Sequence, residues 1–471
     1  MSAAALAAPE RGRRAIVWLV MIVYLLLIFE GAIRKWVAPS MGQALFFIRD
    51  PFVLAIYCIA LRHGFFPKQN NFLLAGLALG VLGLLLAGAQ LMAHRGSLGT
   101  VLLLAGYGWR NYFFYIPLTF VVATALQRED IVRIVKLTLF LAVPMAALVL
   151  LQFASPLTSP INVGIGDEMG QQFHGLTVNQ FHTRPMGTFT SDVGEKEFVV
   201  SCLAMALSLW IAPAARRYVK FWMLLPCTGG VLTCLALSGS RGAMLASGIV
   251  MLAAVGCAVL IRGGSVSARA LLWPAVICVT AVVLYPIVFP EGYTSFMTRW
   301  TQAAVSEHRS FEYGILGRAL YGFYDFFQLM GQAPPLGYGL GLAGNASLIL
   351  GVTIEGFEGW AETDWSRHIV DLGPVLGVVF ILFRIALVTW LASTCIAGAR
   401  RIGDPLPILL LAYVSVELLY GQVTGHGTIN GYAWLFAGLC LAASNARSKT
   451  FAKESAPEPI AVRPRFANLM R

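Results

Sequence analysis

Charged residues are scarce in this sequence. Only 12% of its 471 residues are Asp, Glu, Lys or Arg, whereas an average soluble domain has roughly 25%. Apolar stretches of about 20 residues recur along almost the whole length, and each is long enough to cross a hydrocarbon core of about 30 Å. The alternation over about 10 residues that marks a membrane β-strand is missing. These features exclude an ordinary soluble domain and predict an all-α, polytopic bundle of transmembrane helices.

The usual metal and disulfide motifs are missing as well. Each of the eight cysteines lies in an apolar stretch and no CxxC pair occurs, so neither a disulfide framework nor a zinc site is predicted. The sequence also lacks a P-loop, an HExxH motif and a recognisable Ser-His-Asp constellation. We therefore expect no resident metal and no cofactor.

The net charge of +11 does not by itself indicate nucleic-acid binding, because the basic residues lie mainly in short loops between apolar stretches. They concentrate in the segments that face the cytoplasm if the N-terminus does, as the positive-inside rule describes. We therefore expect membrane lipids and not nucleic acid as partners, with both termini in the cytoplasm.

The apolar stretches are expected to span the membrane, and twelve of them stand out. The first is too long for the apolar part of a signal peptide and no cleavage pattern follows it, so we expect it to be retained. The predicted spans cover residues 15–33, 43–61, 72–92, 104–126, 131–153, 197–212, 219–237, 243–261, 268–289, 369–397, 405–421 and 428–443. The resulting parts are 1–289 with nine spans and a shorter outer loop at 154–196, a large outer loop at 290–366, 367–444 with three spans, and a cytoplasmic tail at 445–471.

The outer loop at 290–366 combines charged residues with many aromatic ones. A loop of more than about 15 residues is usually either functional or disordered. This loop has too many Tyr, Phe, Trp and Leu residues for a disordered segment. We therefore expect a large, folded cap outside the membrane that holds most of the chemistry.

The run SGSRGAMLA at Ser238–Ala246 lies between two predicted spans at the outer face. Its Ser-Gly-Ser turn makes a very short connection, and Arg241 stands beside the start of the following helix. An Arg side chain together with the N–H groups of a helix start would suit a phosphate. The alternative is an Arg that anchors the helix at the lipid headgroups.

The run PPLGYGLGLAGN at Pro334–Asn345 contains a G-x-G-x-x-G pattern. No strand is predicted before it, and no acidic residue follows at the spacing of a dinucleotide-binding unit, so we reject a nucleotide site. The remaining interpretations are a mobile loop and a nest of backbone N–H groups that binds an anion.

Ionisable residues lie within or at the edges of predicted spans at Arg49, Asp50, Arg110, Arg384 and Glu417. An Arg or Asp in the middle of a membrane helix costs about 2.5–3.5 kcal/mol on insertion scales, so each is expected to face a partner or a wet cavity. Adjacent Arg49 and Asp50 could pair locally. The functional alternative is a polar cavity that opens outward and is lined by Arg49, Asp50, Arg110 and Glu417.

The shorter outer loop carries Arg184 and the run GTFTSD at Gly187–Asp192. Its histidines, His174 and His182, do not have the spacing of metal ligands on any predicted element. We expect them to be solvated loop residues.

Taken in order, several of these motifs resemble those of the bacterial O-antigen ligase and polysaccharide polymerase superfamily. The layout is similar over most of the chain, with about twelve spans and one large late periplasmic loop. Each motif is short, and the resemblance depends on their order and their common side of the membrane. The motifs are Arg184 with GTF at Gly187–Phe189, SRG at Ser240–Gly242, Arg318 before PLGYGLG at Pro335–Gly341, and DLG at Asp371–Gly373 followed by Gly377.

The resemblance implies a glycosyltransferase of the bacterial inner membrane. Members of the superfamily transfer a glycan, with inversion, from undecaprenyl pyrophosphate to an acceptor hydroxyl at the periplasmic face. The donor is already activated, so neither a nucleotide nor a metal is required. Partners could include other polysaccharide assembly proteins. The resemblance assigns the binding of pyrophosphate and sugar to Arg184, Arg241, Arg318 and Asp371. The three Arg side chains suit the negative charge of a leaving pyrophosphate.

Two residues are candidates for the general base that deprotonates the acceptor. Members of the ligase branch carry a His-Asn pair upstream of the acidic-x-Gly motif, whereas Glu362 stands there in this sequence and His368 lies just before Asp371. Either Glu362 or His368 is therefore the expected catalytic base. This departure favours a polymerase, which joins lipid-linked repeats, over a ligase, which transfers glycan to a lipid A core.

A lipid-linked glycan flippase or exporter is the alternative from another class of protein. A carrier should line a path that reaches both faces of the membrane, and Arg110 and Arg384 are the residues that could support one. The gathering of charged residues in one outer loop favours the enzyme.

Overall fold

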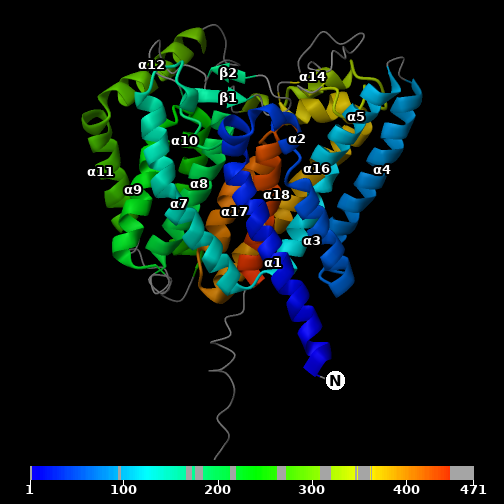
Figure 1. Ribbon diagram of the computed structural model, residues 1–471, viewed down its shortest axis with the longest axis horizontal. Helices are drawn as coiled ribbons and strands as arrows, with labels where there is room; N and C mark the ends of the chain where they lie inside the picture. Colours follow the sequence, from blue (N-terminus) through cyan, green and yellow to red (C-terminus); the bar gives the residue numbers. More distant parts are fainter. Residues whose placement is uncertain are drawn as a thin grey trace, which may run out of the picture.

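The computed structural model describes residues 3–93, 97–165, 172–174, 184–212, 219–261, 272–307, 320–344, 347, 361 and 363–445. Within these ranges the protein is a bundle of helices, which confirms the predicted helical class (Figure 1). The only strands in the described part are β1 (Val163–Ile165) and β2 (Gln172–His174), which pair antiparallel. This small hairpin lies at one end of the bundle.

The helices differ widely in length, and short π and 3-10 segments join several of them. Before the hairpin the chain forms α1 (Ala3–Ala32), the π-helix η1 (Ile33–Val37), the 3-10 helix η2 (Pro39–Met41), α2 (Gly42–Leu45), α3 (Asp50–His63), α4 (Asn71–Ala93), α5 (Leu98–Trp109), the π-helix η3 (Arg110–Phe114), α6 (Ile116–Ala125), α7 (Arg128–Ala154) and the 3-10 helix η4 (Pro160–Asn162). After it come α8 (Asp192–Ile211), α9 (Phe221–Leu237), α10 (Arg241–Leu260), α11 (Leu272–Val288), α12 (Pro290–Glu307), α14 (Phe326–Met330), α16 (Asp364–Ile402), α17 (Leu406–Leu419) and α18 (Gly427–Asn445).

Each predicted apolar stretch contains all or part of at least one of these helices. By length and composition, five helices of the described part could cross a membrane: Pro9–Val37, Asn71–Gln90, Arg128–Ala154, Arg241–Leu260 and Asp364–Ile402. Trp222–Leu237 and Leu406–Leu419 are apolar but shorter. Several helices are therefore suited to a multi-pass membrane protein.

Local sequence signals set several helix ends. α3 and α16 end at Gly64 and Gly403, each with a left-handed φ of 73° that favours glycine. α7 begins with a capping box, in which Gln127 and Asp130 satisfy each other's backbone N–H groups. The Thr363 side chain caps the start of α16. These boundaries follow from residues next to them in the chain.

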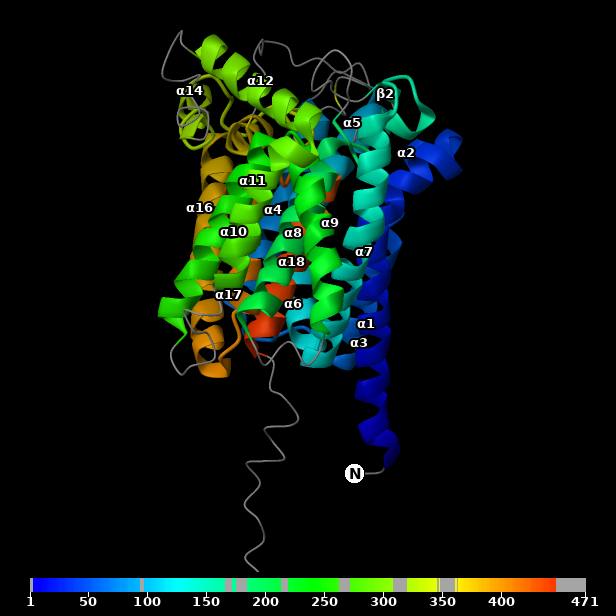
Figure 2. The ribbon, with the colours of Figure 1, turned by 90° about the vertical axis from the view of Figure 1, so that its left-hand side faces the viewer.

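The two ends of the described chain lie toward the same end of the bundle (Figures 1 and 2). In the first half of α1, Arg13 pairs with Asp130 near the start of α7 at 2.7 Å. At the end of α18, the Ser444 carbonyl accepts a hydrogen bond from Arg401 at 3.0 Å. The β1–β2 hairpin, α12 and α14 lie at the opposite end (Figures 1 and 2).

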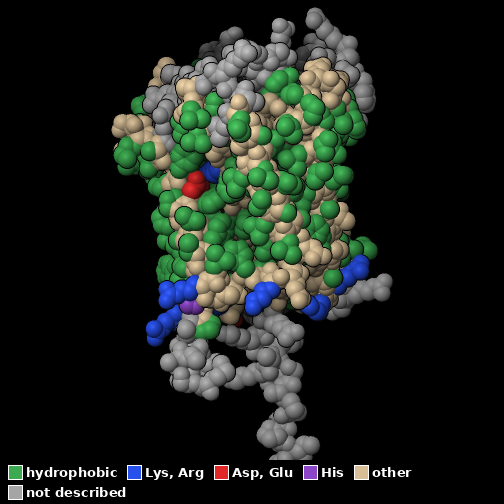
Figure 3. Space-filling model, turned by 90° about the vertical axis from the view of Figure 1, so that its right-hand side faces the viewer, with side chains coloured by type: hydrophobic (Ala, Val, Ile, Leu, Met, Phe, Trp, Pro, Cys, Tyr) green, Lys and Arg blue, Asp and Glu red, His purple; other side chains and the backbone are tan. Residues whose placement is uncertain are grey.

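The lateral surface is apolar, and basic side chains gather along one rim. Leu84 and Leu85 on α4, and Leu252 and Val259 on α10, are each more than half exposed. The space-filling view shows hydrophobic side chains over the body and a row of Lys and Arg side chains along the end where α1 begins (Figure 3). A large exposed apolar surface marks contact with a membrane or a partner.

α17 and α18 form the middle of the bundle (Figure 1). α18 is buried over almost its whole length and packs against α6, α16 and α17. Helices that are apolar on all sides belong in the interior. α17 in turn packs against α8 and α10, which is the arrangement that forms the cavity described below.

The structure describes only part of the predicted outer loop at 290–366. α12 continues from α11 after a single residue and packs against it, and residues 320–344 form turns on either side of α14. Arg318, predicted to bind pyrophosphate, and Glu362, one of the two candidate bases, lie outside the described residues. His182 of the shorter loop also lies outside them.

Candidate functional site

A cavity of about 610 Å³ lies where α10 begins and α17 ends. Its charged lining residues are Arg184, Lys196, Arg241 and Glu417. Arg184 and Arg241, both predicted to bind pyrophosphate, therefore share one cavity with Glu417 of the predicted polar cavity. The larger apolar and aromatic lining residues are Leu245, Ile249, Phe323, Val416, Leu419 and Tyr420.

The Ser-Gly-Ser turn places Arg241 at the cavity. Gly239 has a φ of 57°, in the left-handed region that favours glycine. The Ser240 side chain then caps α10 by accepting a hydrogen bond from Ala243 N at 3.2 Å. Arg241 is therefore the first residue of α10, and the helix start faces the cavity because Gly242 lines it too.

Arg184 reaches the same turn from the shorter outer loop. Its Nη1 lies 2.5 Å from Asp192 Oδ2 at the start of α8, and its Nη2 donates to the Gly239 carbonyl at 3.4 Å. The GTF run that follows is held by Gln152, which accepts from Gly187 N at 2.7 Å and donates to Gly187 O at 3.1 Å. The GTF run thus has a structural role, and Arg184 is the part of this motif that meets the cavity.

Lys196 is a cavity residue that sequence reasoning missed. Its Nζ lies 2.9 Å from Glu417 Oε1 and 3.0 Å from Glu197 Oε1. Both carboxylates are fully buried, and Tyr413 donates to Glu197 Oε2 at 2.6 Å. The Lys196 ammonium group therefore forms ion pairs with two buried carboxylates. The signal that could have revealed it is a lysine between acidic residues, Glu195 and Glu197, just before an apolar stretch.

Glu417 lies near the end of α17, and its two carboxylate oxygens differ in their surroundings. Oε1 accepts from Lys196, whereas Oε2 is buried without a hydrogen-bond partner among the described residues. Oε2 packs against Gly421, where a Cβ would clash with it. Glycine at this position therefore makes room for the carboxylate at the cavity wall.

Buried side chains of α16 hold the end of α17. Arg384 donates from Nε to Leu418 O at 2.6 Å and from Nη2 to Gly421 O at 3.1 Å. Trp365 Nε1 donates to Leu419 O at 2.7 Å. These bonds satisfy carbonyl groups that a helix C-terminus leaves without partners, and the Arg384 cation suits the negative end of the helix dipole. The cavity wall formed by α17 therefore depends on α16.

Arg384 also belongs to a buried hydrogen-bond chain through His368. Its Nη1 contacts Asp364 Oδ2 and lies 2.7 Å from His368 Nε2. His368 Nδ1 is 3.1 Å from Tyr112 Oη, which donates to Asp371 Oδ2 at 3.2 Å. A guanidinium only donates, so Nε2 accepts and the ring proton sits on Nδ1. Fully buried His368 thus has both ring nitrogens engaged, and it does not line the cavity.

The PLGYGLG run packs against a break in α16 at the DLG motif. Gly373 has a φ of 80° inside α16, and a Cβ on it would clash with Pro335 O. Ala343 N, just after the run, donates to Asp371 Oδ1 at 2.8 Å. A protein carboxylate thus occupies the place that an external anion would take in a backbone nest. Asp371, predicted to contact the substrate, is buried and does not line the cavity.

Arg49 and Asp50 each have a distant partner. Asp50 accepts two hydrogen bonds from Arg110, each of 2.9 Å. Arg49 pairs with Glu30 at 2.8 Å. Such partners are expected, because an unpaired charge within a membrane-spanning segment is costly to bury. The local pairing of Arg49 with Asp50 is therefore not the arrangement observed, and of the four residues predicted to line one polar cavity only Glu417 lines this one.

No group of three or more His, Cys, Asp and Glu side chains that could hold a metal ion occurs within the part of the chain that the structure describes. The candidate site therefore consists of cations, a carboxylate and an apolar lining. It can bind an anionic group by charge and hydrogen bonds and an attached hydrocarbon by apolar contact.

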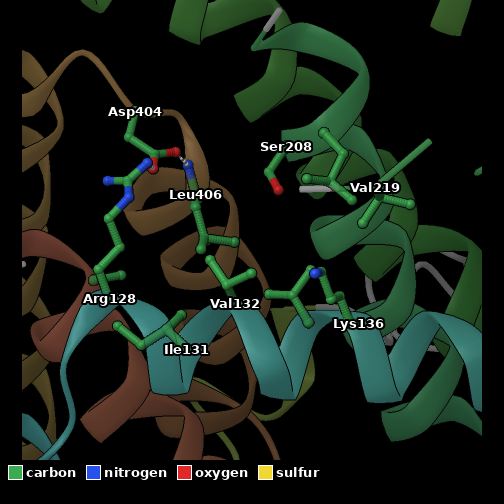
Figure 4. A pocket seen from close by; sticks show the side chains of 11 residues that line it. Arg128, Ile131, Val132, Lys136, Ser208, Val219, Asp404 and Leu406 are labelled. Carbon is green, nitrogen blue, oxygen red and sulfur yellow. Dashed lines mark hydrogen bonds and ion pairs between the residues drawn. The ribbon is translucent and has the colours of Figure 1, made fainter. Parts of the chain in front are cut away.

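A second, much smaller hollow of about 30 Å³ includes residues from the start of α7 and the start of α17 (Figure 4). Arg128 and Asp404 point toward each other there and pair at 2.9 Å. A water needs roughly 10–15 Å³ measured in this way, so the hollow has room for only a few waters. It is too small for a glycan or a lipid headgroup.

No protein-family model and no curated protein match this chain.

Proposed function

We propose that this protein is a glycosyltransferase of the bacterial inner membrane that joins glycan repeats carried on undecaprenyl pyrophosphate. The transfer takes place at the periplasmic face, inverts the anomeric centre and uses no metal. The observation that carries the proposal is the cavity in which Arg184, Lys196 and Arg241 gather beside apolar side chains.

The lining of this cavity suits an amphiphilic phosphate. Arg184 and Arg241 can donate paired hydrogen bonds to phosphate oxygens, and the start of α10 adds partial positive charge. Leu245 and Ile249 follow Arg241 at intervals of four residues, so they lie on the same side of α10. Both are about half exposed, which provides a surface for an isoprenoid chain attached to the phosphate. A soluble nucleotide sugar would not need such a surface.

The reaction exchanges one bond at the anomeric carbon for another. The acceptor oxygen attacks this carbon, the bond from the carbon to the pyrophosphate oxygen breaks, and the acceptor proton passes to a base. Negative charge develops on the departing diphosphate, where Arg184 and Arg241 stabilise it. Arg318, by the resemblance, is a further contact to the donor.

Glu362 is the base in this proposal, and His368 is the alternative. His368 has no exposed surface, and its ring nitrogens already contact Arg384 and Tyr112. A base has to come within hydrogen-bond reach of the acceptor hydroxyl. The surroundings of His368 suit a residue that positions its neighbours better than one that meets an acceptor.

The proposed topology has twelve spans, both termini in the cytoplasm and residues 290–366 on the periplasmic side. The row of basic side chains at the end where α1 begins supports this orientation, because Lys and Arg concentrate on the cytoplasmic side of membrane proteins (Figure 3). The start of α10 and the end of α17 then lie toward the periplasm, where the donor is presented.

A flippase or exporter fits the contacts less well. Arg110 and Arg384 are the residues that could line a carrier path, and both are engaged inside the protein. Arg110 binds the Asp50 carboxylate through two nitrogens, and Arg384 holds the end of α17. A ligase that uses a lipid A core would share the donor site and differ in the acceptor.

Purified protein in liposomes that contain undecaprenyl-pyrophosphate-linked repeats tests the proposal. Longer lipid-linked chains, formed with release of undecaprenyl pyrophosphate, are the expected result. Transfer that needs an added lipid A core would replace the polymerase with a ligase. Movement of unaltered lipid-linked glycan across the bilayer, without release of pyrophosphate, would show a carrier and overturn the proposal.

A further inference from the structure

We propose that Lys196 is a third phosphate ligand of the cavity, which Glu417 holds until the lipid pyrophosphate binds. Lys196 then moves from Glu417 to a phosphate oxygen. The inference rests on the proposed function and adds to it a residue and an exchange of ion-pair partners.

Lys196 is well placed to reach a ligand in the cavity. Its aliphatic part passes the start of α10, because a Cβ on Gly242 would lie 3.9 Å from Lys196 Cδ. The Lys196 side chain is 18% exposed, whereas those of Glu197 and Glu417 are 0% exposed. Of this ion-paired group, only the lysine presents surface to a ligand.

The two carboxylates differ in their position relative to the cavity. Tyr413 donates to Glu197 Oε2 at 2.6 Å, and Lys196 Nζ lies 3.0 Å from Glu197 Oε1. Glu417 lines the cavity, whereas Glu197 does not. A ligand in the cavity therefore competes with Glu417 for the ammonium group, while Glu197 keeps its ion pair with Lys196.

The charge balance of the cavity gives the exchange its physical reason. A diphosphate adds negative charge beside buried side chains, and uncompensated buried charge is costly. When the Lys196 ammonium group moves to a phosphate oxygen, it compensates part of the negative charge that develops on the diphosphate. Among the residues that line the cavity, three cations, Arg184, Lys196 and Arg241, stand against one carboxylate, Glu417.

Glu417→Gln isolates the hold that this carboxylate has on Lys196. Glutamine has nearly the same shape as glutamate and carries no charge. The variant therefore leaves the ammonium group with Glu197 as its carboxylate partner and makes it available to a phosphate. The ionisable side chains that lie against Glu417 or share the cavity with it are Lys196, Glu197, Tyr413, Arg184, Arg241 and Tyr420.

Binding of farnesyl pyrophosphate and farnesyl monophosphate to the purified full-length protein, measured by calorimetry in lipid nanodiscs, tests the exchange. Lys196→Met should weaken pyrophosphate binding about tenfold or more, the size of one charge-assisted hydrogen bond. Glu417→Gln should have the opposite effect and tighten it. The control variants Lys220→Met and Glu129→Gln alter exposed residues outside the cavity and should bind like the wild type.

The opposite signs separate a phosphate ligand from a structural ion pair. If both variants weaken binding, or if Lys196→Met binds pyrophosphate normally, the exchange is wrong while the donor site stands. If Lys196→Met does not fold, Glu417→Gln decides alone, because the exchange requires tighter binding. If the wild type binds neither probe, the pyrophosphate site of the proposed function fails and takes this inference with it.

Discussion

Arg241 begins α10 at the cavity, beside Arg184. A guanidinium offers two parallel donors to a phosphate, whereas an ammonium group is a point charge. Arg241→Lys should therefore lower kcat for transfer about tenfold or more while the protein inserts at normal levels. Release of undecaprenyl pyrophosphate from proteoliposomes measures the effect, and Arg62→Lys at an exposed position of α3 is the control. Full activity in the Arg241 variant would make this residue a headgroup anchor.

The base can be identified by comparing two variants. Glu362→Gln keeps the shape of the side chain and removes its charge, so it should abolish transfer without weakening donor binding. His368→Asn should retain measurable turnover and lower the melting temperature, because Arg384 and Tyr112 lose a buried partner. Turnover and donor binding are measured on the same preparations. Normal transfer by the Gln variant, with none by the Asn variant, would reverse the assignment and favour the ligase branch.

At the level of elements, the end of α17 depends on one residue of α16. Arg384 is buried, donates to the carbonyl groups of Leu418 in α17 and of Gly421 just after it, and contacts the Asp364 carboxylate. Removing one partner of a buried ion pair typically costs about 3–5 kcal/mol, because the other charge stays buried. Arg384→Met should therefore lower the free energy of unfolding by about that amount and reduce transfer, since α17 lines the cavity.

Unfolding in detergent, followed by circular dichroism, measures the effect of Arg384→Met. The control is Arg133→Met, whose exposed side chain pairs with Asp130 at 3.4 Å. Asp130 is buried, but it keeps its ion pair with Arg13 at 2.7 Å when the exposed Arg133 is replaced, so this variant should be close to the wild type. Equal stability of both variants would mean that α17 keeps its end without Arg384.

At the level of the whole molecule, the proposed topology predicts that the end of the bundle with α12 faces the periplasm and that the end with the two termini faces the cytoplasm. A cysteine at Thr301, an exposed position of α12, should react with an impermeant thiol reagent in intact spheroplasts. A cysteine at Lys136, an exposed position in the first half of α7, should react only after permeabilisation. Both belong in a background in which the eight native cysteines are replaced. Labelling with the opposite sidedness would invert the topology and place the cavity at the cytoplasmic end.

The helical class and many helix positions follow from the amino-acid sequence alone. An apolar stretch of membrane length has to satisfy its backbone polar groups internally, and a helix does so within one segment. Ends set by adjacent residues are equally predictable, such as those at Gly64 and Gly403. The Ser-Gly-Ser turn placed Arg241 at a helix start for the same reason, since Gly239 and Ser240 act on their immediate neighbours.

Which charges meet depends on how the helices pack, and the sequence does not show it. Lys196 and Glu417 are 221 residues apart and pair because α8 and α17 pack together. Arg49 and Asp50 are adjacent in sequence, yet each has a partner from another segment. Spacing along one helix relates residues only within about a turn, at intervals of three or four positions. The choice of partner across helices depends on how they pack, so the cavity and its lysine became visible only in the folded protein.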